Sequence, residues 1–307
     1  MKLHAAYWVT AGVLAVAGIV MMGCAFVQRA NLREGRSWSD SFGEFDNIEM
    51  KAGYCTVKVE PIGADEECRV DFVNMPEDTE AYVEGGTLFI KEEKKNRFRF
   101  VSFGDFGWEQ GEVTIYLPER DYKKIKMSVG VAAESVIDSL SCNTLVLDCG
   151  VGDLDLVNSR ITGDLDIDCG TGDFTMREVT VEGKSDIDSG VGRMHMDRVQ
   201  MQKKADIDVG TGDFDVTACE FAELEIDGGV GDVKFLSAKL SGDVDVTLGT
   251  GDIEIEVLGD PMLYNFRLDG SDVTINGDNV KVMNNYDAQY EFKADCGVGD
   301  ISVTFLE

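Results

Sequence analysis

Aspartates recur at a fixed spacing in the middle of this chain, and carboxylates held at a fixed spacing could bind a metal ion or transfer a proton. The stretches DIDCGTGDFTM, DIDSGVGRMHM and DIDVGTGDFDV begin at residues 166, 186 and 206. Each has two aspartates before a pair of glycines, and most copies have a further aspartate after the glycines. These further aspartates are Asp153, Asp173, Asp213, Asp232 and Asp252. In the copy at 186, Arg193 takes this place.

A hard cation is the first ligand that these side chains suggest. Ca²⁺ takes several oxygen ligands, and a chain bend that carries a carboxylate beside free carbonyl groups could supply them. The five aspartates after the glycines are therefore candidate Ca²⁺ ligands, although their spacing matches neither an EF-hand loop nor the nine-residue calcium repeat. The sequence implies no other cofactor.

A solvated acidic face is the alternative interpretation. Like charges stacked about 5 Å apart repel by about 0.8 kcal/mol per pair even in bulk water, so some interaction must offset the repulsion. Aspartates on such a face would keep the chain soluble, block lateral strand pairing and accept hydrogen bonds from turn amides. We favour this interpretation over the cation site.

Catalysis by paired carboxylates is a weaker hypothesis. Retaining glycosidases hold two acids about 5 to 5.5 Å apart, but every pair of neighbouring repeats would offer that spacing. The two histidines of the chain are His4 and His195, and GTGD lacks the lysine of a phosphate-binding loop. We therefore predict that the protein is not an enzyme, with a carbohydrate-active enzyme as the minor alternative.

The glycine pairs define an internal repeat. Their first members are Gly150, Gly170, Gly190, Gly210, Gly229 and Gly249, which gives steps of 20, 20, 20, 19 and 20. The step from Met201 to Phe221 is still 20, whereas the step from Ala205 to Leu224 is 19. One residue is therefore missing between Phe221 and Leu224.

Apolar and polar residues alternate within each repeat, as in Leu165, Ile167 and Cys169. This period of two is typical of short strands with one buried face. Three short strands and three bends in about 20 residues make one coil, in which each strand pairs with its copy in the next coil. We predict an all-β chain that forms a parallel β-solenoid with about 20 residues per coil.

The repeats divide the rest of the chain. We expect regular solenoid repeats and a C-terminal cap over 126–307, preceded by an irregular N-terminal β region over 37–125. Within that region, FDNIEMKAGYCTVKV superposes Ile48 and Val59 on Leu145 and Leu156, so the first coils of the solenoid begin near residue 45. A separate N-terminal β domain is the alternative.

The segment 1–36 is expected to be a membrane anchor helix and a short linker. No charge occurs from Ala5 to Val27, a stretch long enough to cross a bilayer as one helix. A cleaved signal peptide and lipidation at Cys24 are the alternatives, but the apolar run continues past Cys24. We expect a single-pass protein of the cell membrane with its β region outside the cytoplasm.

Charge limits the partners. The net charge of -30 argues against nucleic acid. The segment 91–111 departs from this acidic character, because it interleaves lysines and arginines with aromatic residues. These aromatic residues are Phe98, Phe100, Phe103, Phe106 and Trp108. They are candidate contacts for a protein or a glycan at the cell surface, unless they cap the open end of the solenoid.

Eight cysteines do not settle the redox compartment. Cys55 and Cys68 could form a disulfide, and buried free thiols are an equally good interpretation.

A family resemblance adds to this interpretation. The apolar N-terminal segment, IYLPERDYKKIKMSVGVA at 115–132 and the repeated D-x-D-x-G-[VT]-G-D resemble the bacterial "putative adhesin" family of β-strand-repeat proteins. The resemblance covers about 45–307. It implies a right-handed solenoid at the cell envelope and no catalytic residues, and the function of that family is unassigned. GVAAES at 130–135 departs from the pattern and suggests a capping coil.

We therefore expect a non-enzymatic, membrane-anchored envelope protein that presents an acidic β-solenoid for surface interaction or adhesion. The alternative is a regulatory or sensor partner in an envelope-stress pathway, with the segment 91–111 as its contact.

Overall fold

One coil shows how the alternating sequence becomes structure. In the computed structural model, which describes residues 35–92 and 110–306, β10 (Leu165–Thr171), β11 (Phe174–Arg177) and β12 (Thr180–Val181) follow one another around a bend each. Leu165 and Ile167 are buried, whereas Asp166 and Asp168 between and beyond them are exposed. The prediction of short strands with one buried face is confirmed.

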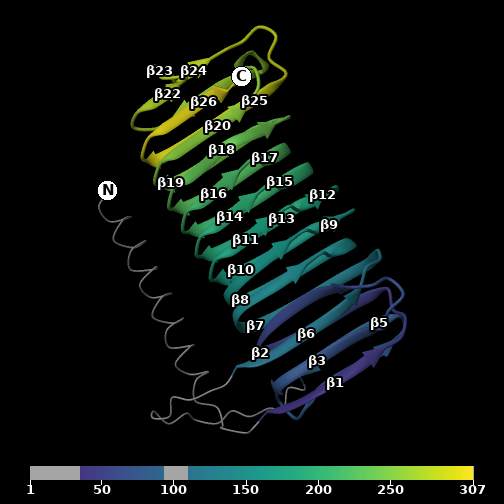
Figure 1. The fold of residues 1–307 in the computed structure, drawn as a ribbon. Coiled ribbons are helices and arrows are strands. Elements are labelled where there is room, and N and C mark those ends of the chain that lie inside the picture. The colour runs from purple at the N-terminus through teal and green to yellow at the C-terminus, as the bar shows by residue number, and fades with distance from the viewer. Residues whose placement is uncertain (1–34, 93–109, 307) are drawn as a thin grey trace, which may run out of the picture.

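Each strand pairs in parallel with its copy in the next coil (Figure 1). Ile167 pairs with Ile187, and Phe174 pairs with Met194, so neighbouring coils follow at the predicted step of 20 in this part of the chain. The single step of 19 falls where it was predicted, because the register shifts after the pair of Met201 and Phe221. The fold is thus all-β with parallel, in-register coils, while its handedness stays a prediction.

Two long walls and a short third side run along the stack. The first wall, which we call the acidic wall, contains the strands β10, β13 (Ser185–Val191) and β19 (Val244–Thr250). It also contains the middle of β8 (Ser141–Val157) and the ends of β15 (Gln200–Thr211) and β17 (Glu220–Val230). The second, the mixed wall, contains β11, β14 (Met194–Asp197), β16 (Phe214–Thr217), β18 (Val233–Leu240) and β20 (Ile253–Leu258). The third side contains β9 (Arg160–Ile161), β12 and the beginnings of β15 and β17.

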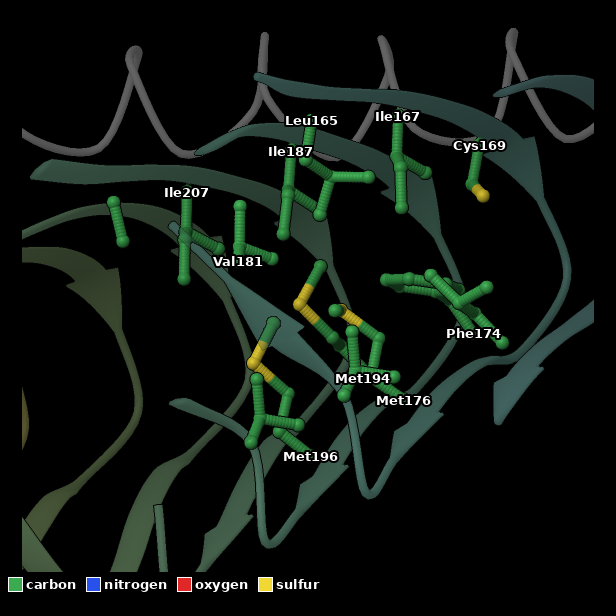
Figure 2. Close-up of a cluster of buried hydrophobic side chains, with 14 of the residues drawn as sticks. Leu165, Ile167, Cys169, Phe174, Met176, Val181, Ile187, Met194, Met196 and Ile207 are labelled. Atoms are coloured by element: carbon green, nitrogen blue, oxygen red, sulfur yellow. The ribbon is translucent and has the colours of Figure 1, made fainter. Parts of the chain in front are cut away.

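The core lies between the two walls. Figure 2 shows Ile167, Ile187 and Ile207 of the acidic wall directed toward the methionines of the mixed wall. Phe174, Met194 and Ile207 are fully buried. Apolar side chains fill the interior along the whole stack, which is where the hydrophobic stabilisation of a solenoid arises.

The two glycines of each pair are needed for different reasons. The second glycine has a positive φ, +140° at Gly172, a conformation that side chains with a Cβ rarely adopt. The first glycine lies against the preceding coil, because a Cβ on Gly170 would be 2.4 Å from the carbonyl oxygen of Gly150. The pair therefore lets the stacked corners approach closely.

A second column of positive φ occurs at the bend after the mixed wall, and there the residues are not glycines. The column comprises Ser139, Asn158, Glu178, Arg198, Ala218 and Ser237, with φ between 50° and 56°. Sequence reasoning did not find this corner because its residue types share no pattern.

The N-terminal layers continue the stack beyond the regular array. β2 (Asn47–Ile62) pairs with β7 (Tyr122–Asp138) on one side and with β5 (Thr87–Glu92) and β6 (Gly111–Pro118) on the other. Ile48 pairs with Ile125, which pairs with Leu145, so the predicted superposition is confirmed. Antiparallel strands complete this end: β1 (Arg36–Phe42), β3 (Cys68–Met75) and β4 (Thr79–Glu84).

The interpretation of GVAAES as a capping coil was wrong. β7, which contains it, has β2 on one side and β8 on the other, so further layers lie beyond it. The register shifts between Val131 and Glu134, which shows that the motif holds one extra residue at the corner. This bulge replaces the tight glycine turn of the later coils.

The last coil in the sequence is not the last coil of the stack. β25 (Tyr290–Val298) lies between β19 and β21 (Tyr264–Asp269), and β26 (Ile301–Leu306) lies between β20 and β22 (Val273–Ile275). The short strands β23 (Asp278–Asn279) and β24 (Val282–Met283) then pair antiparallel with β22 and β21. A one-turn 3₁₀ helix, η1 (Pro261–Leu263), precedes β21.

The predicted membrane anchor lies in residues 1–34, outside the described residues. Within residues 35–92 and 110–306, we find no helix of the length and apolar character that a bilayer span requires.

Candidate functional site

The aspartates after the glycines form a ladder of hydrogen bonds along the stack. The Oδ1 atom of Asp153 accepts a hydrogen bond from the backbone N–H of Asp173 at 2.8 Å, one coil further on. Asp173 accepts in turn from the N–H of Arg193 at 2.8 Å, and Asp232 from the N–H of Asp252 at 2.9 Å. Each carboxylate therefore satisfies a corner amide that its own coil cannot reach.

The ladder continues into the inserted C-terminal coil. Asp252 accepts from the N–H of Asp300 at 2.8 Å, and Asp300 accepts from the N–H of Asp272 at 3.0 Å. Asp272 belongs to GSDV at 270–273, a further copy of the corner motif that the sequence analysis missed. Its signal is weak because serine replaces the second glycine and one residue of the pattern is absent.

Arg193 interrupts the ladder, because its side chain has no oxygen to offer the N–H of Asp213. The arginine instead extends toward Asp215 in the next coil, with 3.9 Å between Nε and Oδ2. The sequence difference at this position thus has a local structural consequence.

The aspartates before the glycines lie on the outer face of the acidic wall, where adjacent coils place them side by side. Asp166 pairs with Asp186, and Asp168 with Asp188, in the parallel register. Among the described residues, seven of these carboxylates have no lysine or arginine within ion-pair distance: Asp148, Asp166, Asp168, Asp186, Asp188, Asp208 and Asp227. Lys204 pairs with Asp206 and Glu225, and Lys293 with Asp245.

The crowding of these carboxylates affects their protonation. Burial, followed by the charges of Asp208, Asp186 and Asp168, raises the pKa of Asp188. Burial, followed by the charges of Asp227, Asp206 and Asp186, raises the pKa of Asp208. The wall therefore holds its negative charge at an electrostatic cost, which a cation or a basic partner would lower.

Ion pairs join neighbouring coils on the other sides of the stack. Lys234 pairs with Glu254 across two coils of the mixed wall at 2.8 Å. At the bends, Arg198 pairs with Glu178, and Lys239 with Glu220 on the third side. The acidic wall differs from these sides because five successive coils place aspartates without ion pairs next to one another there, from Asp148 to Asp227.

The candidate Ca²⁺ ligands do not gather into one site. Asp153, Asp173, Asp213, Asp232 and Asp252 lie in successive coils, and each gives one oxygen to the ladder. Within the described residues no group of three or more histidine, cysteine or acidic side chains is arranged to hold a metal ion. Binding of Ca²⁺ stays a prediction.

The candidate partner contacts Phe98, Phe100, Phe103, Phe106 and Trp108 lie outside the described residues. The segment that contains them connects β5 to β6, two strands of the N-terminal layers.

The described cysteines are buried free thiols, Cys55 and Cys68 among them. Burial raises the pKa of both thiols to about 12. They act as small apolar side chains of the core, as one of the two interpretations proposed.

In-register coils, glycine corners and ladders of stacked side chains define a β-strand-repeat protein of the solenoid type. The chain belongs to the Toastrack DUF4097 family, whose pattern matches residues 45–262. No curated protein matches the sequence.

Several solved structures are similar to this chain. A "putative adhesin" of Bacteroides fragilis is 14% identical, with 87% of this chain and 97% of that chain covered and a TM-score of 0.39. A "putative adhesin" of Parabacteroides distasonis is 14% identical, with 89% and 98% covered and a TM-score of 0.40. A "putative lipid binding protein" of the same species is 12% identical, with 89% and 98% covered and a TM-score of 0.43. None of these three proteins is described as an enzyme.

Proposed function

We propose that this chain is a non-enzymatic, membrane-anchored envelope protein that presents its acidic wall to a basic partner in surface interaction or adhesion. The observation that supports this proposal is the contrast between the two walls. Carboxylates without ion pairs are stacked in register over successive coils of the acidic wall, whereas on the mixed wall an ion pair such as that of Lys234 with Glu254 joins neighbouring coils.

The stacking is costly within the molecule itself. Each pair of neighbouring carboxylates repels by about 0.8 kcal/mol at 5 Å even in bulk water, and the wall aspartates before the glycines are not the ones that form the ladder to corner amides. A partner that carries lysines or arginines would remove this repulsion and gain ion pairs along the whole wall. A stiff stack of nearest-neighbour coils keeps such a surface extended.

The test uses the full chain in zwitterionic nanodiscs and a lysine decapeptide as the probe. A wall variant carries Asp166→Asn, Asp168→Asn, Asp186→Asn, Asp188→Asn and Asp208→Asn. A control variant neutralises five exposed acids elsewhere that form no side-chain hydrogen bond or ion pair with the described residues: Glu44→Gln, Asp65→Asn, Glu67→Gln, Glu84→Gln and Asp287→Asn. Both variants have the same net charge.

We expect the wall variant to bind the decapeptide at least about tenfold more weakly than the control variant, with a smaller salt dependence. Equal affinities would mean that only the total charge matters, and would contradict a role for the wall as a specific surface.

Membrane anchoring is a separate part of the proposal and has its own test. The full chain should remain in the membrane fraction after an alkaline carbonate wash, whereas a chain that lacks residues 1–34 should not. Release of the full chain by the wash would refute the anchor and leave the wall unaffected.

The regulatory alternative depends on the aromatic residues of the segment 91–111. It stays a prediction, because those residues lie outside the described residues and no described contact favours it.

A further inference from the structure

The acidic wall changes character where its sheet continues into the N-terminal layers. On the outer face, Tyr82 of β4 pairs with Phe89 of β5, Phe89 with Glu49 of β2, and Glu49 with Lys126 of β7. The neighbouring column comprises Glu80, Lys91, Lys51 and Ser128. We call Tyr82, Phe89, Lys51, Lys91 and Lys126 the aromatic–lysine patch.

Two aromatic rings form one side of this patch. The ring centroids of Tyr82 and Phe89 are 5.4 Å apart, with 33° between the ring planes. Tyr82 is 37% exposed, although it lies on a strand of the continuous sheet. The Lys91 ammonium is held 3.8 Å from the Phe89 ring centroid and 5.9 Å from that of Tyr82, which places a cation beside an exposed aromatic surface.

Two lysines of the patch could bind an anion. In the part of the chain that the structure describes, Lys51 and Lys126 are exposed and have no carboxylate within ion-pair distance. Most cations elsewhere in the array are paired, as Lys58 is with Glu112 and Lys123 is with Asp46. Unpaired lysines thus gather beside one exposed and one half-buried aromatic ring on one face of a very acidic chain.

The chemistry of the patch selects its ligand. Aromatic rings at a surface offer flat apolar contact area with little loss of side-chain entropy, which suits the apolar face of a sugar ring. The free lysines suit a carboxylate. Glu49 lies within the patch, between Phe89 and Lys126, and Glu80 borders it, so a ligand with no more than one negative charge per sugar unit meets the least repulsion.

Densely charged polyanions fit less well. Each strand of B-form DNA carries one charge about every 3.4 Å of helix axis, and an anionic membrane presents many charges at once. Both would meet Glu49, Glu80 and the wall aspartates as well as the lysines.

We propose that the aromatic–lysine patch binds an acidic saccharide, with a sugar ring packed on Tyr82 and Phe89 and a sugar carboxylate held by Lys51, Lys91 and Lys126. The two columns of the patch cross four strands, β4, β5, β2 and β7, and neighbouring strands lie about 4.8 Å apart. The aromatic and the lysine ends of the patch can therefore contact successive sugar units. The site is separate from the unpaired aspartates on which the proposed function rests, so either proposal can fail alone.

The test measures binding of a short oligogalacturonate to the full chain in zwitterionic nanodiscs, by calorimetry, against a neutral glucose oligosaccharide. We expect the oligogalacturonate to bind and the neutral oligosaccharide to bind at least about tenfold more weakly. Tyr82→Ala should weaken binding about five- to tenfold through loss of ring packing, and Lys51→Gln with Lys126→Gln by a similar factor. Tyr82→Phe, which keeps the ring, should retain most of the affinity.

Tyr286→Ala is the matched control, because Tyr286 is fully exposed at the other end of the stack. Thermal unfolding of each variant checks that the fold is kept. Equal binding of the acidic and neutral oligosaccharides, or equal effects of Tyr82→Ala and Tyr286→Ala, would overturn the proposal. So would Tyr82-dependent binding of a single-stranded oligonucleotide or of anionic vesicles that exceeds binding of the oligogalacturonate.

Discussion

Replacing Arg193 by asparagine should restore the missing rung of the aspartate ladder and stabilise the protein. The backbone N–H of Asp213 faces residue 193, where the equivalent amides of Asp173 and Asp232 are bonded to carboxylates at 2.8 and 3.1 Å. A restored hydrogen bond contributes about 1 kcal/mol. The loss of the exposed contact between Arg193 and Asp215, at 3.9 Å, costs between about 0 and 1 kcal/mol.

Comparison of asparagine with aspartate at residue 193 distinguishes the effect of the restored hydrogen bond from the effect of charge repulsion. Arg193→Asn adds an oxygen without a charge, so we expect a net gain of up to about 1 kcal/mol. Arg193→Asp adds the same hydrogen bond but also repulsion from Asp173 and Asp213, about 1.6 kcal/mol in total at 5 Å. We expect Arg193→Asp to be no more stable than the wild type, and Arg193→Ala to be slightly less stable.

Urea unfolding measures the stabilities, and hydrogen exchange of the Asp213 amide measures the local effect, since repeat arrays can unfold in parts. The amide of Asp213 should exchange faster than that of Asp232 in the wild type and should slow in Arg193→Asn. The reasoning is refuted if the Asp213 amide exchanges no faster than that of Asp232, or if alanine stabilises the protein as much as asparagine.

Three other substitutions test separate features of the fold. Burial raises the pKa of Glu92, whose buried Oε1 atom has no hydrogen-bond partner among the described residues. The stability that this group contributes is therefore present below its unfolded pKa and is lost as the pH rises through its folded pKa. In urea unfolding, Glu92→Gln should be more stable than the wild type at pH 7 but not at pH 4, and an equal difference at both pH values would contradict this. Val129→Ile should fill the cavity of about 20 Å³ beside Val57, Met127 and Leu147 and stabilise the protein by up to about 0.8 kcal/mol. A lower melting temperature would show that the cavity cannot accept a methyl group. Ala218→Gly should raise the free energy of unfolding by about 0.5 to 1 kcal/mol, because Ala218 has a φ of 51° that glycine adopts more readily. Gln200→Gly, on an extended strand, should lower the free energy of unfolding. A change of the same sign in both variants would refute the argument.

The regular coils could be predicted because their pattern is local and repeated. Alternation around Ile167 indicates a strand, and the constant step between repeats fixes the residue to which it pairs. The register shift after Met201 follows from the same count. The N-terminal superposition of Ile48 on Leu145 extended this reasoning to a region with longer insertions.

The order of the last coils could not be predicted in this way. β25 and β26 pair with strands on both sides because the chain passes over β21 and β22 before it returns. Pairing of this kind is non-local, and the step from Gly249 to Gly297 is more than twice the regular step of the array. The spacing of the sequence repeat alone does not show which strand a later strand will pair with.

The different roles of the aspartates likewise could not be predicted from the sequence. Asp166 and Asp173 belong to one repeat and have the same chemistry, yet Asp173 accepts a hydrogen bond from a corner amide whereas Asp166 lies without an ion pair on the acidic wall. The difference arises from which backbone N–H faces each carboxylate in the next coil. The column at Ala218 was missed for a related reason, because its backbone conformation is shared while its side chains are not.

The role of the acidic wall is tested most directly by carbodiimide labelling of carboxylates in intact cells that produce the full chain, compared with the same chain purified in zwitterionic nanodiscs. If a basic partner covers the wall, Asp166, Asp186 and Asp188 should be labelled less in cells than in nanodiscs, while the exposed Glu44, Asp65 and Glu84 should be labelled equally in both. Equal labelling of the wall carboxylates in cells and in nanodiscs would contradict the proposal that this wall is the interaction surface.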